Sequence, residues 1–510
     1  MNLYQKVNCK SLSLVVFIFA LLASVKLFSQ RPNVIIVYAD DLGYGDLSCY
    51  GATKIKTPNI DKLTEKGIRF TRAYSSSATC TPSRYSLMTG RYAFRKSGTG
   101  VLPGDAALII DTQETTLPGI FRQADYHTAI VGKWHLGLGN SVEKNFNAKI
   151  SPGPNEIGFD YSYIFPATAD RVPTVFMENG KVVALDKSDT IRVNYREKIG
   201  NEPTGKENPE LLKLKNSPNH GHDQTIVNGI GRIGYMTGGQ SARWTDEEIS
   251  TTFLAKSLEF IENNKNHPFF LFFSLTEPHV PRMPATMFKG KSGLGLRGDA
   301  ILQIDWTIKQ LMEKLEYAGI DKNTIVILTS DNGPVLDDGY EDGAVTQLNG
   351  HTPEGILRGG KYSIYEAGTR VPFIVHWPQK IKSAQVSPAL VSQVDFISSF
   401  KELLKIKYIN DNTDSENHWS AFTGKSKKGR EKLIVHAGTL ALIYNDWKYI
   451  HPSGGPMMSI LTNIELGNRP YPQLYDLNSD PGEKVNLASR HVDKMKMMEA
   501  ELVKIKSDKK

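Results

Sequence analysis

Cysteine is scarce in this sequence, with three residues among 510. A scaffold held together by several disulfides is therefore excluded. Long hydrophobic runs are also missing, because the uncharged stretch over residues 11–25 is shorter than the roughly 20 residues of a membrane span and no other stretch qualifies. The length and the 40% hydrophobic composition instead indicate a globular protein with a large core and room for more than one domain.

Charge of one sign is not in large excess. The chain has 61 Lys and Arg residues against 54 Asp and Glu residues, a formal net charge of +7. Nucleic-acid binding requires a concentrated basic face, and we interpret the one conspicuous basic run, residues 425–432, as a solvated loop. We therefore expect no nucleic-acid partner.

Residues 1–29 have the pattern of an export signal. Lys6 and Lys10 precede the apolar stretch, and the small residue Ser29 suits cleavage. Cys9 lies before the apolar stretch, whereas a lipid-attachment cysteine would follow it. We predict a signal peptide over 1–29 and a mature protein without a membrane span, exported to the periplasm or secreted.

The rest of the chain predicts an α/β fold. Amphipathic helical patterns, such as the one from Ile301 to Leu315, alternate with continuous apolar runs that are typical of buried parallel strands. This alternation predicts a large, mostly parallel sheet sandwiched by helices. The runs cover residues 33–39, 127–131, 269–275 and 324–330.

Two regions depart from the alternation. Residues 137–244 are rich in Asn, Gly and Pro, which predicts long functional loops on the sheet. From about residue 431, short strands and a terminal helix beginning near His491 predict a smaller C-terminal α+β subdomain. We expect a main domain over 30–430 and an antiparallel-sheet subdomain over 431–510.

Polar residues follow each of the four predicted strands. An Asp after a strand is by itself most often a turn residue. In open α/β sheets, however, ligands bind outside the carboxyl ends of the strands, and the joint placement predicts one site at that edge. The residues are Asp40 and Asp41, then Lys133 and His135, then Glu277 and His279, and finally Asp331 and Asn332.

Four of these residues form a set of hard oxygen ligands. Asp40, Asp41, Asp331 and Asn332 suit Ca²⁺ or Mg²⁺ rather than zinc. Three carboxylates crowded together would repel one another unless a cation offset their charge. Export favours calcium, because extracellular calcium sites can be weak and still be filled.

Cys80 lies where a helix is predicted to begin. Pro82 suits the first helical turn and Gly90 ends the helix, so Cys80 is expected just before a helix N-terminus, where anions bind. Arg84 is placed to turn its guanidinium toward that end. The ordinary alternative for an exported protein is a disulfide between Cys80 and Cys49.

The Cys80 segment resembles the signature of the formylglycine-dependent sulfatases of the alkaline phosphatase superfamily, and the chain is most similar to exported bacterial carbohydrate sulfatases. Other family-like motifs occur in family order over most of the chain. The segments are Cys80-Thr-Pro-Ser-Arg84 with Leu87-Met-Thr-Gly90-Arg91, Asp40-Asp41-Leu-Gly-Tyr-Gly-Asp46, Gly132-Lys133-Trp134-His135, Ser330-Asp331-Asn332-Gly333, Gly359-Gly360-Lys361 and Leu474-Tyr475-Asp476.

The resemblance implies an alkaline phosphatase-like fold and a sulfatase activity. It implies that a sulfatase-maturation enzyme oxidises Cys80 to Cα-formylglycine, which leaves Cys49 unpaired. A formylglycine oxygen would join Asp40, Asp41, Asp331 and Asn332 on one calcium ion. Arg84 and Lys133 would steady the formylglycine and the sulfate. His135 would act as the base, and either His279 or Lys361 would serve as the acid.

The expected substrate is a sulfated carbohydrate, namely oligosaccharides derived from a polysaccharide. Asp170 and Arg171, in the polar insertion, are candidates to meet sugar hydroxyls or a uronate, and their alternative is a loop salt bridge. Two other functions stay open at this point. One is a phosphonate monoester or phosphodiester hydrolase, and the other is a non-enzymatic polysaccharide-binding protein with an unmodified Cys80.

Two further groups of polar residues are interpreted as having no role in the site. His220 and His222 form a short HxH motif in a loop, which we read as solvent-exposed. The acidic residues between 337 and 342 are read as a solvated loop, at most at the rim of the pocket.

Overall fold

The computed structural model describes residues 31–141, 143–407 and 413–508. The predicted signal peptide and Cys9 lie outside the described residues. Among the helices of the described ranges, none combines the length and the apolar composition needed to cross a membrane.

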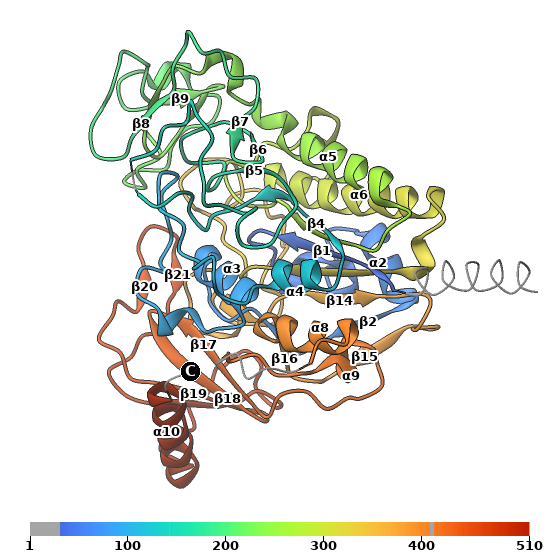
Figure 1. Cartoon of the computed structure of the whole chain (residues 1–510). Coiled ribbons are helices and arrows are strands. Elements are labelled where there is room, and N and C mark those ends of the chain that lie inside the picture. Colours follow the sequence, from blue (N-terminus) through green and yellow to red (C-terminus); the bar gives the residue numbers. More distant parts are fainter. Residues whose placement is uncertain (1–30, 142, 408–412, 509–510) are drawn as a thin grey trace, which may run out of the picture.

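A ten-stranded sheet forms the centre of the molecule (Figure 1). Its middle strand, β1 (Asn33–Ala39), pairs in parallel with β12 (Phe269–Ser274) and β13 (Thr324–Ser330). The parallel order continues from β12 to β4 (His127–Lys133) and β5 (Tyr161–Phe165). All four predicted strands are present. The remaining strands lie at the two edges: β14 (Phe373–His376), β2 (Gly67–Phe70) and β15 (Gln385–Ser387) beyond β13, and β6 (Met177–Glu178) and β7 (Lys181–Val182) beyond β5.

Helices cover both faces of this sheet, as expected. Side chains alternate between the two faces of a strand, so β1 contributes Val34 and Ile36 to one apolar cluster and Ile35 and Val37 to the other. The first cluster includes apolar residues of α3 (Cys80–Thr89), α4 (Leu117–Gln123) and α8 (Phe396–Leu404). The second includes those of α2 (Pro58–Glu65), α5 (Ile249–Asn264) and α6 (Gly295–Tyr317).

The insertion between β4 and α5 is built from loops and very short strands. It contains β8 (Arg192–Asn194) paired with β11 (Tyr235–Thr237), and β9 (Ile226–Val227) paired with β10 (Ile230–Gly231). These loops lie together at one end of the molecule, at the top of Figure 1. The same stretch also holds β5, an interior strand of the large sheet that the sequence pattern did not reveal.

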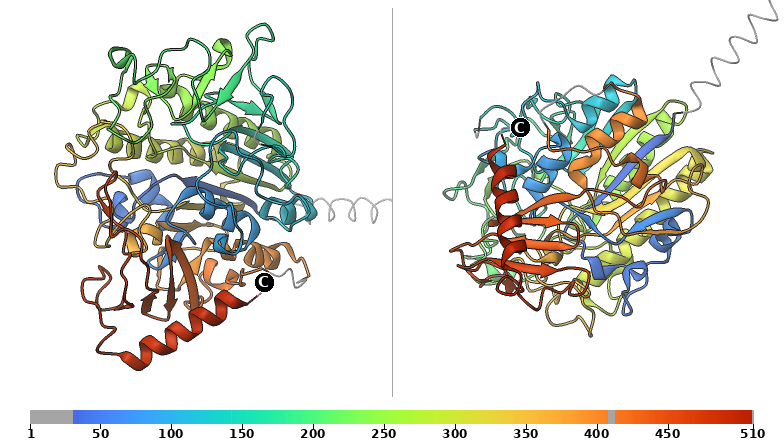
Figure 2. Two further views of the ribbon diagram at one scale, coloured as in Figure 1. Left: turned by 90° about the vertical axis from the view of Figure 1, so that its left-hand side faces the viewer. Right: turned by 90° about the horizontal axis from the view of Figure 1, so that it is seen from below.

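A smaller antiparallel sheet follows near the C-terminus, confirming the predicted subdomain. Its four strands are β17 (Lys432–Ala437), β18 (Thr439–Tyr444), β19 (Trp447–Ile450) and β22 (Gln473–Asp476). Helix α10 (Val492–Ser507) lies along it, with Met498 and Leu502 in the shared apolar cluster (Figure 2). A hairpin of β20 (Met458–Ser459) and β21 (Ile464–Glu465) leaves this sheet. The domain boundary at residue 431 stays a prediction.

A buried ion cluster joins the small sheet to the main domain. Lys448 Nζ lies 3.1 Å from Glu366 Oε1 and 3.0 Å from Glu483 Oε1. Glu366 begins the short helix α7 (Glu366–Thr369), which follows the segment that carries Lys361. All three side chains of the cluster are fully buried.

Candidate active site

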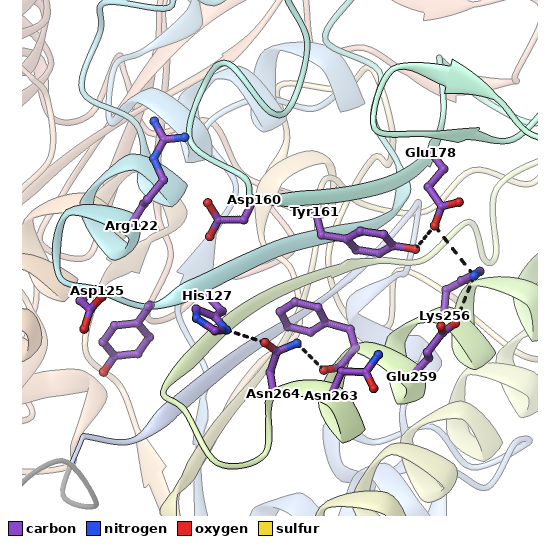
Figure 3. A pocket seen from close by; sticks show the side chains of 12 residues that line it. Arg122, Asp125, His127, Asp160, Tyr161, Glu178, Lys256, Glu259, Asn263 and Asn264 are labelled. Atoms are coloured by element: carbon purple, nitrogen blue, oxygen red, sulfur yellow. Dashed lines mark hydrogen bonds and ion pairs between the residues drawn. The ribbon is translucent and has the colours of Figure 1, made fainter. Parts of the chain in front are cut away.

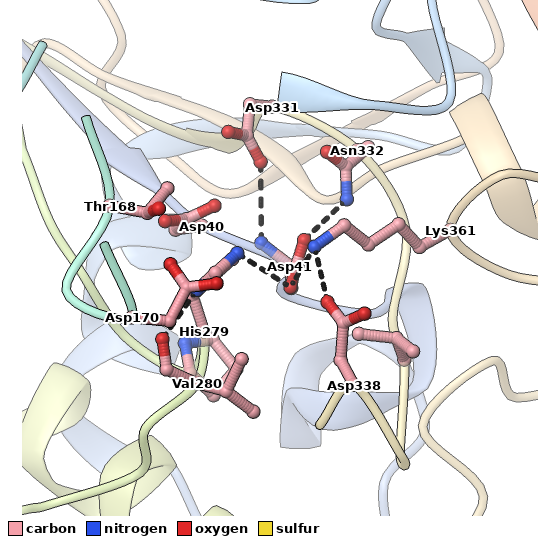
Figure 4. Close-up of polar contacts among 12 residues, drawn as sticks. Asp40, Asp41, Thr168, Asp170, His279, Val280, Asp331, Asn332, Asp338 and Lys361 are labelled. Carbon is pink, nitrogen blue, oxygen red and sulfur yellow. Dashed lines mark hydrogen bonds and ion pairs between the residues drawn. The ribbon is translucent and has the colours of Figure 1, made fainter. Parts of the chain in front are cut away.

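The carboxyl ends of the central strands converge on one polar cluster (Figure 4). Asp40 and Asp41 directly follow β1, and Asp331 directly follows β13. Backbone hydrogen bonds hold the ends of these strands together, because Asp40 N donates to Glu277 O at 3.0 Å and Asp331 N donates to Ala39 O at 3.1 Å. Asp41 has a φ of 62°, a costly conformation for a non-glycine residue that is typical of functional sites.

Three carboxylates meet within this cluster. Oxygens of Asp40, Asp41 and Asp331 lie within 4.8 Å of one another, and all three side chains are buried. Asn332 Nδ2 donates to Asp41 Oδ1 at 2.7 Å. Asp40 Oδ1 and Asn332 Oδ1 are buried without a hydrogen-bond partner among the described residues. Unpartnered buried oxygens beside crowded carboxylates fit a hard divalent cation.

Three basic side chains surround the carboxylates. Lys133 Nζ lies 2.6 Å from Asp40 Oδ2, Arg84 Nη2 lies 2.8 Å from Asp331 Oδ2, and Lys361 Nζ lies 2.9 Å from Asp41 Oδ2. Burial favours the neutral form of Asp331, but the attraction of Arg84 and Lys133 outweighs it and lowers the pKa of this carboxyl. Burial, together with repulsion from Asp331, raises the pKa of the Asp40 carboxyl well above its usual value.

Cys80 faces the same cluster from the start of a helix. It is buried and is the first residue of α3, so the helix begins one residue earlier than predicted. Its Sγ, a carboxylate oxygen of Asp40 and a ring nitrogen of His279 lie within 4.8 Å of one another. Burial raises the pKa of the Cys80 thiol. Cys49 and Cys80 are both free thiols, so the alternative of a disulfide between them is wrong.

Each candidate histidine has one ring nitrogen that faces a backbone carbonyl and one that faces the site. His135 Nε2 lies 2.9 Å from Leu102 O, and its buried Nδ1 has no hydrogen-bond partner within the described ranges. His279 Nδ1 lies 2.7 Å from Val280 O, and its Nε2 makes no hydrogen bond to any residue that the structure describes but lies 3.9 Å from Asp41 Oδ2. Because a carbonyl only accepts, the nitrogen facing it carries the proton and the other nitrogen is free to accept one. Burial lowers the pKa of both rings well below the usual value.

The acidic loop after Asn332 contributes to the site, and the interpretation as a solvated loop is wrong for two of its residues. Asp338 Oδ2 lies 2.8 Å from Lys361 Nζ, and Asp338 Oδ1 accepts from Tyr362 Oη at 3.2 Å. Asp342 is buried and pairs with Arg282 at 2.7 Å. The sequence did hold a signal for this contribution, namely the high density of acidic residues in the loop that precedes the Gly359-Gly360-Lys361 motif.

His222 is also placed differently from the prediction. It is 5% exposed, and its Nε2 lies 3.0 Å from Asp170 Oδ2, so the solvent-exposed interpretation is wrong for this residue. Arg171 Nη1 lies 2.9 Å from Asp170 Oδ1. Burial opposes ionisation of Asp170, but Arg171 and His222 overcome it and hold the pKa of its carboxyl well below the usual value. Asp170 and Arg171, the two residues that the sequence suggested for substrate binding, therefore form a charged pair, and His222 joins it through Asp170.

One cavity connects these groups. It has a volume of about 570 Å³ and is lined by Cys80, Lys361 and His279, by the Asp170–Arg171 pair, and by the β20–β21 hairpin. The sequence-predicted residues that line it thus come from segments far apart in the chain.

A second cavity of about 590 Å³ lies at the opposite end of β4 (Figure 3). His127, the first residue of that strand, contacts Asn264 there at 2.6 Å, and Tyr161 Oη donates to Glu178 at 2.6 Å. These polar groups already have partners, and none belongs to the sequence-predicted set. The cavity beside Cys80 is therefore the candidate active site.

Known proteins match the chain over nearly its whole length. The family model described as Sulfatase matches residues 32–406. A curated N-acetylgalactosamine-6-O-sulfatase of Bacteroides thetaiotaomicron is 52% identical over 482 residues, which cover 94% of this chain and 94% of that protein. Human Arylsulfatase D is 28% identical and covers 89% of this chain and 82% of its own length.

A solved structure gives the same picture. It was described in work on the metabolism of multiple glycosaminoglycans by Bacteroides thetaiotaomicron. It has 52% sequence identity to this chain and superposes with a TM-score of 0.92, covering 94% of this chain and 100% of that structure.

Proposed function

Because this chain belongs to the sulfatase family, we propose that it hydrolyses the 6-O-sulfate ester of N-acetylgalactosamine in oligosaccharides derived from a sulfated polysaccharide. The observation that carries the proposal is the match, along almost the entire chain, to a curated enzyme with that activity. The cavity beside Cys80 supports it, because its charged wall of Asp170, Arg171 and His222 offers donors and acceptors for sugar hydroxyls.

The proposal includes two groups that the chain would hold. Asp40, Asp41, Asp331 and Asn332 would bind one calcium ion, which the unpartnered oxygens of Asp40 and Asn332 favour. Cys80 would be present as Cα-formylglycine, made by a maturation enzyme, and its buried position beside Asp40 and His279 suits this role. Together these groups would supply a hydroxyl nucleophile and positive charge next to the sulfate.

The basic side chains would receive the sulfate charge. Arg84, Lys133 and Lys361 each contact at least one carboxylate of the cluster, so they are held in place before substrate arrives. Preorganised cations around the group that gains charge are worth several kcal/mol in a site closed to water. Asp338 helps to hold Lys361, and we assign it a positioning role.

The two histidines would move the protons. His135 Nδ1 is free and unprotonated, which suits it to take a proton from the nucleophile at Cys80. Burial works against the charged form of Lys361, but Asp338 and Asp41 reverse this and raise its pKa well above the usual value, so Lys361 is a poor proton donor. His279 is the better acid for the leaving alcohol, because a sulfate beside its ring would raise its low pKa.

Export to the periplasm or the medium remains part of the proposal. It is supported by the pattern of residues 1–29 and fits a polysaccharide-derived substrate, which is met outside the cytoplasm.

The test is a comparison of esters on enzyme that has been expressed with a maturation enzyme. We expect sulfate release from 6-O-sulfated N-acetylgalactosamine, with kcat/KM at least 100-fold above that for 4-O-sulfated N-acetylgalactosamine, because a shifted ester would misplace the sulfate by more than 1 Å. An aryl phosphonate monoester assayed in parallel should react more slowly than an aryl sulfate. A preference for the 4-O-sulfate or for the phosphonate would contradict the proposed function.

A further inference from the structure

Most of the apolar lining of the cavity beside Cys80 comes from the C-terminal subdomain, and Val101 and Ile233 of the main domain add to it. Three large apolar residues of the β20–β21 hairpin line the cavity. They are Met458 in β20, and Ile460 and Leu461 in the turn between β20 and β21. Their exposed fractions are 43%, 95% and 45%. Large apolar side chains gathered at the edge of a polar pocket are costly to leave in water, and such patches mark binding sites.

The hairpin is fixed to the segment that carries the site residue Lys361. Ser363 Oγ donates to Glu465 O at 2.6 Å, and Ile364 N donates to Leu466 O at 3.0 Å. Leu466 N in turn donates to Met457 O at 2.8 Å. The apolar tip therefore stands at a defined place relative to the bottom of the cavity.

The geometry of the proposed substrate places a particular group at this tip. With the 6-O-sulfate at Cys80 and Lys361, the sugar ring enters through C6 and C5. In a six-membered ring C2 lies opposite C5, so a substituent on C2 points away from the catalytic groups and toward the mouth of the cavity. In N-acetylgalactosamine that substituent is an acetamido group, which ends in a methyl.

The two walls of the cavity differ in what they can offer this methyl group. Asp170, Arg171 and His222 form a charged wall whose members pair with one another, and an apolar methyl gains nothing there. The tip of the hairpin offers apolar contact and loses exposed area when the methyl covers it.

We propose that Met458, Ile460 and Leu461 bind the acetamido methyl and give the enzyme its preference for N-acetylgalactosamine over galactose. This inference rests on the proposed function and extends it to a specificity-determining surface. The three residues are contributed by the C-terminal subdomain, which is thereby part of the substrate pocket.

The test compares two 6-O-sulfated sugars that differ only at C2, N-acetylgalactosamine and galactose. We expect the parent enzyme to favour the acetamido sugar by about tenfold in kcat/KM, the low end for one apolar group in a pocket. In Ile460→Ser and Leu461→Ser this ratio should fall severalfold toward unity, while kcat/KM for the galactose ester changes by less than about twofold.

Met457→Ser is the matched control. Met457 belongs to the same segment and is 55% exposed, but it does not line the cavity, so its variant should keep the parental ratio. An unchanged ratio in both cavity variants would overturn the inference, and so would an equal loss on both sugars, which would mean that the hairpin only supports Lys361. If the parent hydrolyses neither sugar, the proposed function fails and this inference fails with it.

Discussion

Lys133 Nζ lies 2.6 Å from Asp40 Oδ2, and both side chains are buried at the carboxyl edge of the central sheet. A buried lysine and a buried aspartate each depend on the other for charge compensation. The same Asp40 is proposed to bind calcium. The ammonium group and the cation would therefore share one carboxylate, and the stability of the site would depend on both.

Lys133→Ala should lower kcat by about 100-fold, because it removes one preorganised positive charge. It should also lower the free energy of unfolding by about 3 kcal/mol in the absence of calcium, since Asp40 loses its partner. Saturating calcium should recover part of this loss by replacing the missing charge. Denaturant unfolding with and without calcium measures both effects.

The surface variant Lys256→Ala, which removes a partly exposed pair with Glu259, should cost less than about 1 kcal/mol. A calcium effect of equal size in Lys133→Ala and Lys256→Ala would contradict the shared role of Asp40.

Asp331→Asn should abolish turnover and weaken calcium binding by at least tenfold, because it removes a carboxylate from the ligand set. Calorimetric titration with calcium measures the affinity, and circular dichroism checks the fold. Asp337→Asn, on the loop outside the carboxylate cluster, is the matched control.

Chelation of the parent should abolish activity and calcium should restore it, whereas restoration by zinc alone would contradict the oxygen-ligand assignment.

Glu277 should make stability depend on pH. Burial raises the pKa of its carboxyl from an ordinary 4.5 to about 7. Below pH 4.5 both the folded and the unfolded states are protonated. Between pH 4.5 and 7 the unfolded state ionises first, so the contribution of Glu277 to stability falls as the pH rises, by about 3 kcal/mol in total.

Glu277→Gln removes this titration. Its free energy of unfolding relative to the parent should therefore rise from pH 4.5 to pH 7 and level off above pH 7. Chemical denaturation at a series of pH values gives the difference in the free energy of unfolding between the variant and the parent. The buried histidines titrate in both proteins, so their contribution cancels in this difference. The exposed variant Glu313→Gln should give a flat difference, and a flat result for Glu277→Gln as well would show that this carboxyl does not titrate near neutrality.

Lys448→Met should destabilise the packing of the small C-terminal sheet against the main domain. It leaves Glu366 and Glu483 buried without their shared cation, which costs about 3–5 kcal/mol. Lys432→Met removes a more exposed pair with Glu501 and should cost less than about 1 kcal/mol. Equal midpoints of thermal unfolding for the two variants would refute a structural role for the buried cluster.

The sequence predicts well which polar residues meet at the carboxyl edge of the sheet, for a physical reason. Asp40, Lys133 and Asp331 lie at the ends of strands that are buried on both faces, and such strands are recognisable as continuous apolar runs. Their carboxyl ends meet at one edge whatever loops connect them. The family-like motif at Cys80 then places the helix that faces this edge.

The parts of the site that sequence reasoning missed lie in loops. His222 reaches Asp170 across 52 residues, and Asp338 reaches Lys361 across 23 residues, through irregular backbone. Such contacts leave no periodic signal, and a charged residue in a polar loop is ordinarily solvated. The strand β5 was missed because its five residues lie in a stretch that is rich in Asn, Gly and Pro.

The central claim is that Cys80 acts as formylglycine, and the mass of the peptide that carries it tests this most directly. The enzyme is expressed with a maturation enzyme that accepts only cysteine, digested and weighed, and its turnover is measured beside that of Cys80→Ser. We predict that the parent peptide has the mass of the aldehyde or its hydrate and that Cys80→Ser does not turn over, because covalent catalysis requires a second step that a serine ester cannot complete. An intact thiol in fully active enzyme, or multiple turnover by Cys80→Ser at a rate near that of the parent, would contradict the account.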